Sequence, residues 1–366
     1  MKISVDRATL TEAVTGVSKA VTMRSSIPVL EGILMRAEGL QLTLTGYDLE
    51  MGIITNIEAN VQEAGEVVLS AKLLGDMVRR LDSDVIEIDV DGSGNATVRG
   101  GITEYNITGL NPEDFPNMPN PDANGAIDMD AGRLRELIDT TLYAVSTDEK
   151  HPAHTGALFS FGTDSLTVVA LDGYRLAIIT KNYKPMKDIN IIIPAKTLSE
   201  VSKLAGEDDN MVHISANRRF VVFEAGAYTI MSRLIEGEFL DYERVVPQGF
   251  KTRAVVDVRE FINSVERASL IITERLKNPL RISFTDKVTI RCTTALGKVV
   301  DEINAAVEGE QVEIGFNNRY LLDALRNAGC DKVAIEMNGP LSPVKIVPAD
   351  GGDFIFLVLP VRFKND

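Results

Sequence analysis

The sequence predicts an α+β protein in which one kind of domain occurs three times, each copy packing two helices on a curved antiparallel sheet. Three observations lead to this prediction. The chain has 366 residues, more than one ordinary domain. Similar segments recur about every 122 to 127 residues. Short strands with alternating apolar residues lie between two amphipathic helical segments in each copy.

The first recurring segment is an acidic residue followed by apolar residues at spacings of three and four. It occupies residues 5–21, 129–145 and 256–272. The acidic residues that open the segments are Asp6, Asp130 and Asp257. A carboxylate in this position accepts hydrogen bonds from the free amides of the first helical turn. We therefore expect each copy to begin with an Asp-capped helix.

The second recurring segment is a strand that leads into a short helix and is followed by another strand. Its three versions are "EVVLSAKLLGDMVRRL", "NIIIPAKTLSEVSKLA" and "VEIGFNNRYLLDALRNA". The second helices are expected at residues 72–81, 196–204 and 317–327. With the alternating segments at 40–59 and 166–183, each copy should contain two helices and about eight strands on one strongly curved sheet.

Turn-forming residues separate the copies. Pro and Gly are concentrated in "PNPDANG", residues 119–125, and in "PQGFKT", residues 247–252. The expected domains are residues 1–121, 122–248 and 249–366.

The segment "ALDGYRLA", residues 170–177, places charged residues beside a glycine within an apolar run. Gly173 to Leu176 aligns with Gly46 to Leu49 at an offset of 127, with Arg175 opposite Asp48. Because the charge is reversed between the copies, a shared catalytic role is not favoured. We predict a bend between two strands, marked by glycine.

Composition excludes several classes of protein. Hydrophobic residues make up 45% of the chain and charged residues 25%, as in a globular protein with sizeable cores. The apolar runs are too short for a membrane span, and the N-terminus lacks an apolar signal core, so we expect a cytoplasmic protein with no membrane association. Cys292 and Cys330 lie in different segments and are expected to be structural thiols.

Motifs for catalysis are absent from the sequence. It contains no P-loop, nucleophile elbow, HExxH or dinucleotide-binding glycine pattern. His151 and His154 in "HPAH" lack the further donors that a metal needs, and His213 alternates with apolar residues as in a strand. The glycines of "GSGN", residues 92–95, indicate a hairpin turn. We expect no catalytic residue, no metal and no cofactor.

Basic residues are concentrated on the second helices. The net charge of −15 argues against a protein that coats nucleic acid over its whole surface. The second helices nevertheless carry three acidic residues, Asp76, Glu200 and Asp323, and seven basic ones: Lys72, Arg79, Arg80, Lys196, Lys203, Arg319 and Arg326. Their recurrence predicts one common surface facing a polyanion, with Arg24 on the same side. Because there is no Trp, DNA would be held through its phosphates without sequence readout.

Several motifs in order resemble one family. "IPVLEGILM", "LTLTGYDLEM", the triple repeat, "ALDGYRLA" and the terminal "LPVR" make the chain similar to the beta subunits of bacterial DNA polymerase III, the sliding clamps, over essentially all 366 residues. The resemblance implies a non-catalytic processivity factor. Two copies would form a head-to-tail homodimeric ring, with the helices lining a hole that encloses duplex DNA.

The resemblance also implies the site residues and partners. The pore residues would be Arg24 and the seven basic residues named above. Ring closure would use Tyr105, Ile107, Leu270 and Ile271. A groove would receive a Leu-Phe peptide motif of the polymerase III alpha subunit, the clamp loader, and other polymerases and repair proteins. Its residues would be Leu171, Gly173, Tyr174, Arg175, Leu176, Pro247, Asn317, Tyr320, Ser342, Pro343, Leu357, Leu359, Pro360, Val361 and Arg362.

Some residues depart from the family pattern and leave the peptide preference open. They are His154, Leu240 and the extension from Phe363 to Asp366. Two other functions remain as alternatives: a protein-binding scaffold that never encloses DNA, and a metal-dependent hydrolase of repeated domains. The hydrolase would require convergent carboxylates or histidines, which the repeat does not supply.

Overall fold

The computed structural model describes residues 1–119, 126–183, 189–273 and 278–363, and within them the chain forms 26 strands and six α-helices. The predicted boundary after residue 121 and residues 364–366 of the C-terminal extension lie outside the described residues. Contacts divide the chain into two compact units, Met1–Leu134 with Lys196–Leu234, and Arg135–Ala195 with Ile235–Asp366.

Each copy contains the predicted two helices and eight or nine strands. The first copy consists of β1 (Lys2–Asp6), α1 (Arg7–Val17), β2 (Gly32–Glu38), β3 (Gln41–Tyr47), β4 (Met51–Glu58), β5 (Asn60–Glu63), β6 (Gly65–Ser70), α2 (Ala71–Arg80), β7 (Val85–Val90), β8 (Asn95–Gly100) and β9 (Thr103–Thr108). The second consists of β10 (Ala126–Asp130), α3 (Ala131–Leu142), β11 (Gly156–Phe161), β12 (Ser165–Leu171), β13 (Arg175–Asn182), β14 (Ile189–Pro194), α4 (Ala195–Leu204), β15 (Met211–Ala216), β16 (Phe220–Ala225) and β17 (Tyr228–Arg233). The third consists of β18 (Thr252–Asp257), α5 (Val258–Ser269), β19 (Leu280–Phe284), β20 (Val288–Thr294), β21 (Gly297–Ile303), β22 (Ala306–Gly309), β23 (Val312–Phe316), α6 (Asn318–Arg326), β24 (Lys332–Met337), β25 (Val344–Pro348) and β26 (Phe354–Val358).

Neighbouring copies share antiparallel sheets. In the first unit, β4 of the first copy pairs with β17 of the second, in an eight-stranded sheet ordered β10-β15-β16-β17-β4-β3-β2-β6. In the second unit, β13 of the second copy pairs with β26 of the third, in a nine-stranded sheet ordered β14-β11-β12-β13-β26-β25-β24-β18-β22. A five-stranded sheet, β5-β1-β7-β8-β9, and a four-stranded sheet, β21-β20-β19-β23, complete the units. The division into units therefore passes through the second copy.

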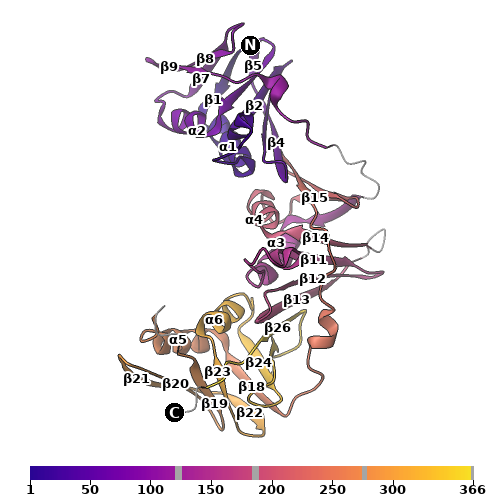
Figure 1. The fold of residues 1–366 in the computed structure, drawn as a ribbon, viewed down its shortest axis with the longest axis vertical. Helices are drawn as coiled ribbons and strands as arrows, with labels where there is room; N and C mark the ends of the chain where they lie inside the picture. The colour runs from indigo at the N-terminus through magenta and orange to yellow at the C-terminus, as the bar shows by residue number, and fades with distance from the viewer. Residues whose placement is uncertain (120–125, 184–188, 274–277, 364–366) are drawn as a thin grey trace. The chain divides into compact units, whose positions relative to one another are not determined.

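The predicted caps account for where the helices begin. Asp6 accepts a hydrogen bond from the Thr9 amide at 2.8 Å at the start of α1, and Asp257 accepts one from the Glu260 amide at 2.9 Å at the start of α5. α3 begins directly after Asp130. α1 packs against α2, and α5 against α6 (Figure 1). The prediction of two helices on antiparallel strands in each copy is confirmed. The single curved sheet expected for each copy was wrong, because the strands of each copy are divided between two sheets.

The bend in "ALDGYRLA" is a hairpin turn between β12 and β13. Gly173 has a φ of 87°, in the left-handed region that glycine adopts without steric cost. The Asp172 carboxylate accepts hydrogen bonds from the amides of Tyr174 and Arg175 at 2.9 and 3.0 Å. The turn is thus held by its own aspartate, as an Asx turn.

The equivalent turn in the first copy lies three residues later than our alignment predicted. Asp48 accepts the amides of Glu50 and Met51 at 3.0 and 2.7 Å, and Leu49 has a φ of 75°. Asp48 therefore matches Asp172 at an offset of 124. The predicted offset of 127 was wrong because Gly46 belongs to strand β3 and does not form the turn.

Gly46 is required by a close approach of two backbones. A Cβ atom there would lie 2.1 Å from the carbonyl oxygen of Val17, at the end of α1. We expect Gly46→Ala to destabilise the protein by about 1–3 kcal/mol, because the helix end and β3 must move apart. Thermal unfolding followed by circular dichroism should show a lowered midpoint. Gly92→Ala is the matched control, since its Cβ meets nothing within 4 Å. Equal midpoints for the two variants would contradict this account.

Candidate functional site

Arg175, the first residue of β13, joins the hairpin to helix α6. Its Nε donates a hydrogen bond to Asp172 at 3.0 Å, and its Nη1 donates one to Asp323 of α6. The guanidinium also lies over the rings of Tyr320 and Tyr143, at 4.9 and 5.5 Å from their centroids. The Arg175 side chain is only 12% exposed, so its charge is balanced by two carboxylates in a largely desolvated position.

The C-terminal segment is held against this hairpin. The Leu359 amide donates to the carbonyl oxygen of Tyr174 at 2.9 Å, and the Val361 amide donates to that of Gly315 at 2.8 Å. The ring of Phe363 lies 4.2 Å from the guanidinium of Arg281. The segment after β26 therefore continues, hydrogen-bonded, between the hairpin and strand β23.

An apolar cluster lies beneath the hairpin. Its buried members are Leu158, Val169, Leu171, Leu176, Ile178, Ile192 and Leu357, with Ala153, Ile235, Phe239, Tyr242, Val246 and Ile355 partly buried against it. Three of the predicted groove residues, Leu171, Leu176 and Leu357, thus belong to one core. Because these three side chains are packed in the core, they hold the hairpin in position.

Exposed apolar side chains lie above this cluster. Tyr174 is 60% exposed and stacks on Tyr320, with ring centroids 5.9 Å apart. Leu359 and Val361, on either side of Pro360, are each 36% exposed, although their amides are held by hydrogen bonds. We call Tyr174, Tyr320, Leu359 and Val361 the hairpin–tail surface.

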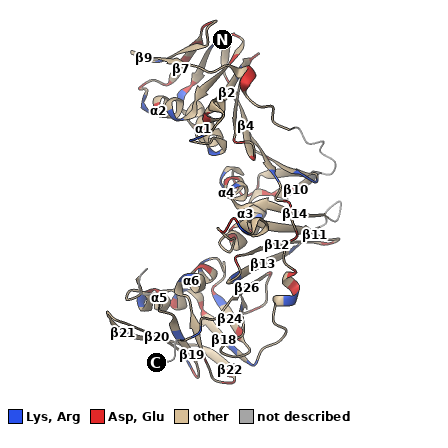
Figure 2. Ribbon diagram, in the orientation of Figure 1, with Lys and Arg blue, Asp and Glu red and all other residues tan. Residues whose placement is uncertain are grey.

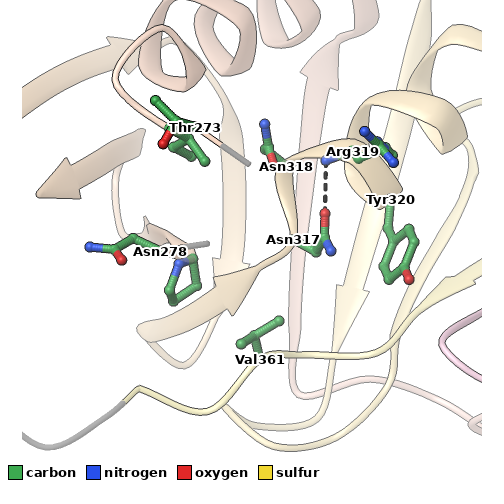
Figure 3. Close-up of a pocket in the computed structure, with 9 residues that line it drawn as sticks. Thr273, Asn278, Asn317, Asn318, Arg319, Tyr320 and Val361 are labelled. Atoms are coloured by element: carbon green, nitrogen blue, oxygen red, sulfur yellow. Dashed lines mark hydrogen bonds between the residues drawn. The ribbon is translucent and has the colours of Figure 1, made fainter. Parts of the chain in front are cut away.

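A pocket of about 570 Å³ adjoins the hairpin–tail surface (Figure 3). It is lined by Ile272, Thr273, Asn278, Pro279, Asn317, Asn318, Arg319, Tyr320 and Val361. The side chain of Asn317 caps α6 by accepting a hydrogen bond from the Arg319 amide at 3.0 Å, as Figure 3 shows. The structure therefore brings together three predicted groove residues, Asn317, Tyr320 and Val361, around one pocket.

For the remaining predicted groove residues, the structure gives their burial and their neighbours along the chain. Pro247 is partly buried and follows Val246, which packs on the cluster. Ser342 and Pro343 are partly buried just before β25, Pro360 is partly buried, and Arg362 is exposed. Their roles in the groove stay predictions.

Some residues of the site were missed by the sequence analysis. Asp323 was counted only as an acidic residue of the third helix, although its spacing of three from Tyr320 places both on one helix face. Tyr143, which contacts Arg175 and lies edge-on to Phe356 at 5.5 Å, had no sequence signal. Burial raises the pKa of the Tyr143 hydroxyl well above its ordinary value, so the ring faces Arg175 as a neutral phenol.

The equivalent region of the first copy is filled by its own chain. Gly52 stands where the second copy has Leu176, and a Cβ there would lie 2.3 Å from the Cε of Met118. Met118 packs on the equivalent cluster. Glu50 and Arg233, joined by a backbone hydrogen bond of 2.8 Å, occupy the positions of Tyr174 and Leu359. The junction of the first and second copies therefore has charged residues where the junction of the second and third presents apolar ones.

The predicted pore residues are all exposed, and half of them have acidic partners. Figure 2 colours Lys and Arg blue and Asp and Glu red along the ribbon. The paired residues are Arg79 with Asp76 at 2.9 Å, Lys203 with Glu200 at 2.9 Å, Arg326 with Glu266 at 2.7 Å, and Lys196 with Asp48. Within the described residues, no ion pair involves the other four, Arg24, Lys72, Arg80 and Arg319. Their positive charge remains available to a polyanion.

The predicted ring-closure residues lie at the surface of each unit. Tyr105 and Ile107 point to the same face of β9, which is the last strand of the five-stranded sheet. Leu270 directly follows α5 and is 81% exposed, and Ile271 beside it is partly buried. Both segments offer apolar side chains that the chain covers only in part.

Metal chemistry has no support in the described part of the chain, where no three His, Cys, Asp or Glu side chains converge on a position suited to a metal ion. His213 lies in β15, as predicted, and its ring contacts Asp128. Cys292 is buried and Cys330 partly buried, both as free thiols. No helix of the described residues is long and apolar enough to cross a membrane.

Comparisons with known proteins match nearly the whole chain to one family. Models of the N-terminal, central and C-terminal domains of the DNA polymerase III beta subunit match residues 1–119, 128–241 and 243–362. The beta sliding clamp of Bacillus subtilis is 31% identical over 376 residues, covering 99% of this chain and 100% of the relative.

Solved structures give the same result. The DNA polymerase sliding clamp of Bacillus subtilis matches with a TM-score of 0.96 and 30% identity, over 100% of both chains. A sliding clamp of Bartonella birtlesii, bound to griselimycin, matches with a TM-score of 0.94 and 29% identity, over 99% of this chain and 100% of that one. The chain therefore belongs to the DNA polymerase III beta subunit family, the sliding clamps.

Proposed function

We propose that this sliding clamp acts as a homodimeric ring that encloses duplex DNA without reading its sequence. In this function it tethers the polymerase III alpha subunit, the clamp loader, and other polymerases and repair proteins by a short peptide motif. Such a processivity factor is non-catalytic, and a role in replication would place it in the cytoplasm. The observation that carries the docking part of the proposal is the hairpin–tail surface, where exposed apolar side chains lie on a rigid hydrogen-bonded frame.

The peptide would lie across the hairpin–tail surface. Leucine and phenylalanine side chains suit it because Tyr174, Leu359 and Val361 offer apolar area that docking would remove from water. The buried cluster and the Arg175 network hold this area in place, so little ordering is needed on binding. The adjoining pocket, lined by several amides, suits polar residues that flank the apolar motif.

The exposed cations support the DNA part of the proposal. We expect the double substitution Lys72→Ala and Arg80→Ala to shorten the lifetime of the loaded ring on circular DNA. The slope of the logarithm of DNA affinity against the logarithm of salt concentration should become shallower by about 1 for each lost phosphate contact. Lifetimes should be measured on a nicked plasmid after loading, over a series of salt concentrations.

Lys203→Ala is the matched control, because Glu200 already neutralises Lys203. Lys203→Ala should shorten the lifetime on DNA less than either single substitution, Lys72→Ala or Arg80→Ala, does alone. An unchanged lifetime for the double variant would favour the scaffold alternative, in which the basic helices never face DNA.

A further inference from the structure

The "HPAH" segment packs against the same apolar cluster that supports the docking surface. Residues Pro152–Thr155 form a short 3-10 turn, in which the His154 amide donates to the carbonyl oxygen of His151 at 2.9 Å. The His154 carbonyl oxygen accepts the Ser146 amide at 2.8 Å. Ala153 packs on the cluster, and the His154 ring meets Phe239 edge-on, with centroids 5.9 Å apart. His154 is therefore held at the margin of the cluster.

The internal repeat shows what this position otherwise holds. In the first copy the equivalent 3-10 turn is Pro28–Glu31, 124 residues earlier, and the residue that matches His154 is Leu30. Leu30 is 1% exposed and belongs to the cluster that also contains Phe115, the equivalent of Phe239. An imidazole thus replaces a core leucine in the second copy, whose β12–β13 hairpin contributes Tyr174 to the hairpin–tail surface.

The environment of His154 disfavours its charged form. Burial lowers the pKa of the His154 imidazole from its ordinary value, and the nearby charge of His151, whose ring centroid is 5.8 Å away, lowers it further. Phe239, in the segment after β17, contacts the imidazole with its aromatic ring, and the charged group that acts on the His154 pKa is His151. The imidazole is therefore neutral at pH 7 and above, and it becomes a cation beside apolar side chains as the pH falls.

We propose that His154, at the margin of the cluster that supports the hairpin–tail surface, makes docking pH-dependent, because protonation of its imidazole weakens the docking of an apolar peptide. The inference rests on the proposed docking function. A bound peptide removes water from the margin of the cluster, so the bound state takes up the proton less readily than the free state. Linkage then requires the affinity to fall toward acid pH, by at most about tenfold per pH unit.

The test is the pH dependence of peptide affinity for the full chain. A fluorescent peptide ending in Gln-Leu-x-Leu-Phe should be titrated by anisotropy between about pH 5.5 and 8. The wild type should bind with constant Kd above about pH 7 and several-fold more weakly at about pH 5.5. His154→Leu should show a nearly flat profile. His151→Gln, the neighbouring control, should keep the pH dependence, with its midpoint shifted upward because one positive charge is gone.

Other outcomes separate this inference from the docking function. Equal pH dependence in wild type and His154→Leu would show that another group titrates, and a flat wild-type profile would equally overturn the role of His154. Circular dichroism at each pH reports whether the chain stays folded. Absence of peptide binding by the wild type even at about pH 7.5 would remove the docking function itself, and this inference with it.

Discussion

Ile271→Asp is expected to give a chain that runs as a monomer of 39.9 kDa. Leu270, 81% exposed, and Ile271 form an apolar projection at the end of α5. Ring closure in the proposed dimer would bury it against Tyr105 and Ile107 of the partner copy. Removing a carboxylate from water in such an apolar contact costs several kcal/mol, enough to dissociate a dimer at micromolar concentration. Size-exclusion chromatography with light scattering measures the mass directly.

Two further variants make this result specific. Leu40→Asp, at a residue 74% exposed in the turn between β2 and β3, should leave the dimer mass unchanged. Ile107→Asp should dissociate the dimer as Ile271→Asp does, because both faces of the contact are needed. Monomers should also be lost from circular DNA, since a single copy cannot close around it. A dimer mass for Ile271→Asp would contradict the assigned interface.

Truncation before Leu359 is expected to abolish docking of the labelled Gln-Leu-x-Leu-Phe peptide. It removes two of the four residues of the hairpin–tail surface and the amide that donates to Tyr174, while β26, which ends at Val358, remains. Apolar anchors of this kind are worth about 2 kcal/mol or more each, so the Kd should rise at least about a hundredfold. Fluorescence anisotropy measures the loss.

The matched control is truncation after Phe363. It removes residues 364–366 but keeps the tail hydrogen bonds and the contact of Phe363 with Arg281. Its Kd should equal that of the full chain. Full-strength binding by the chain truncated before Leu359 would move the docking site away from the hairpin–tail surface and leave the ring fold unaffected.

Local sequence signals predicted the repeated fold well. Asp6 and Asp257 cap helices because a carboxylate before an apolar period satisfies free amides, which depends only on neighbouring residues. The alternation of apolar and polar residues predicted the strands for the same reason. The pairing of β4 with β17 and of β13 with β26 was not predicted, because strand partners far apart in the chain leave no local periodicity.

The site was predicted only in part. "ALDGYRLA" and "LPVR" are recognisable motifs, and the structure places Tyr174 and Leu359 in direct hydrogen-bonded contact. The partners of Arg175 were missed, since Asp323 lies 148 residues away and Tyr143 carries no motif. The basic residues of the second helices were predicted as one set. The sequence did not predict which of them are neutralised by an acidic partner, as Lys203 is by Glu200, because this depends on side-chain geometry.

The sequence by itself determined the three copies, their helices and strands, and the family, because these depend on periodicity, caps and motifs written along the chain. The tertiary structure alone decided where an apolar surface stays open. In the first copy Met118 fills the space beside Gly52, whereas in the second Leu176 lies in the core and Tyr174 stays exposed. The reason is physical: whether a side chain is covered depends on atoms that packing brings to it from distant parts of the chain.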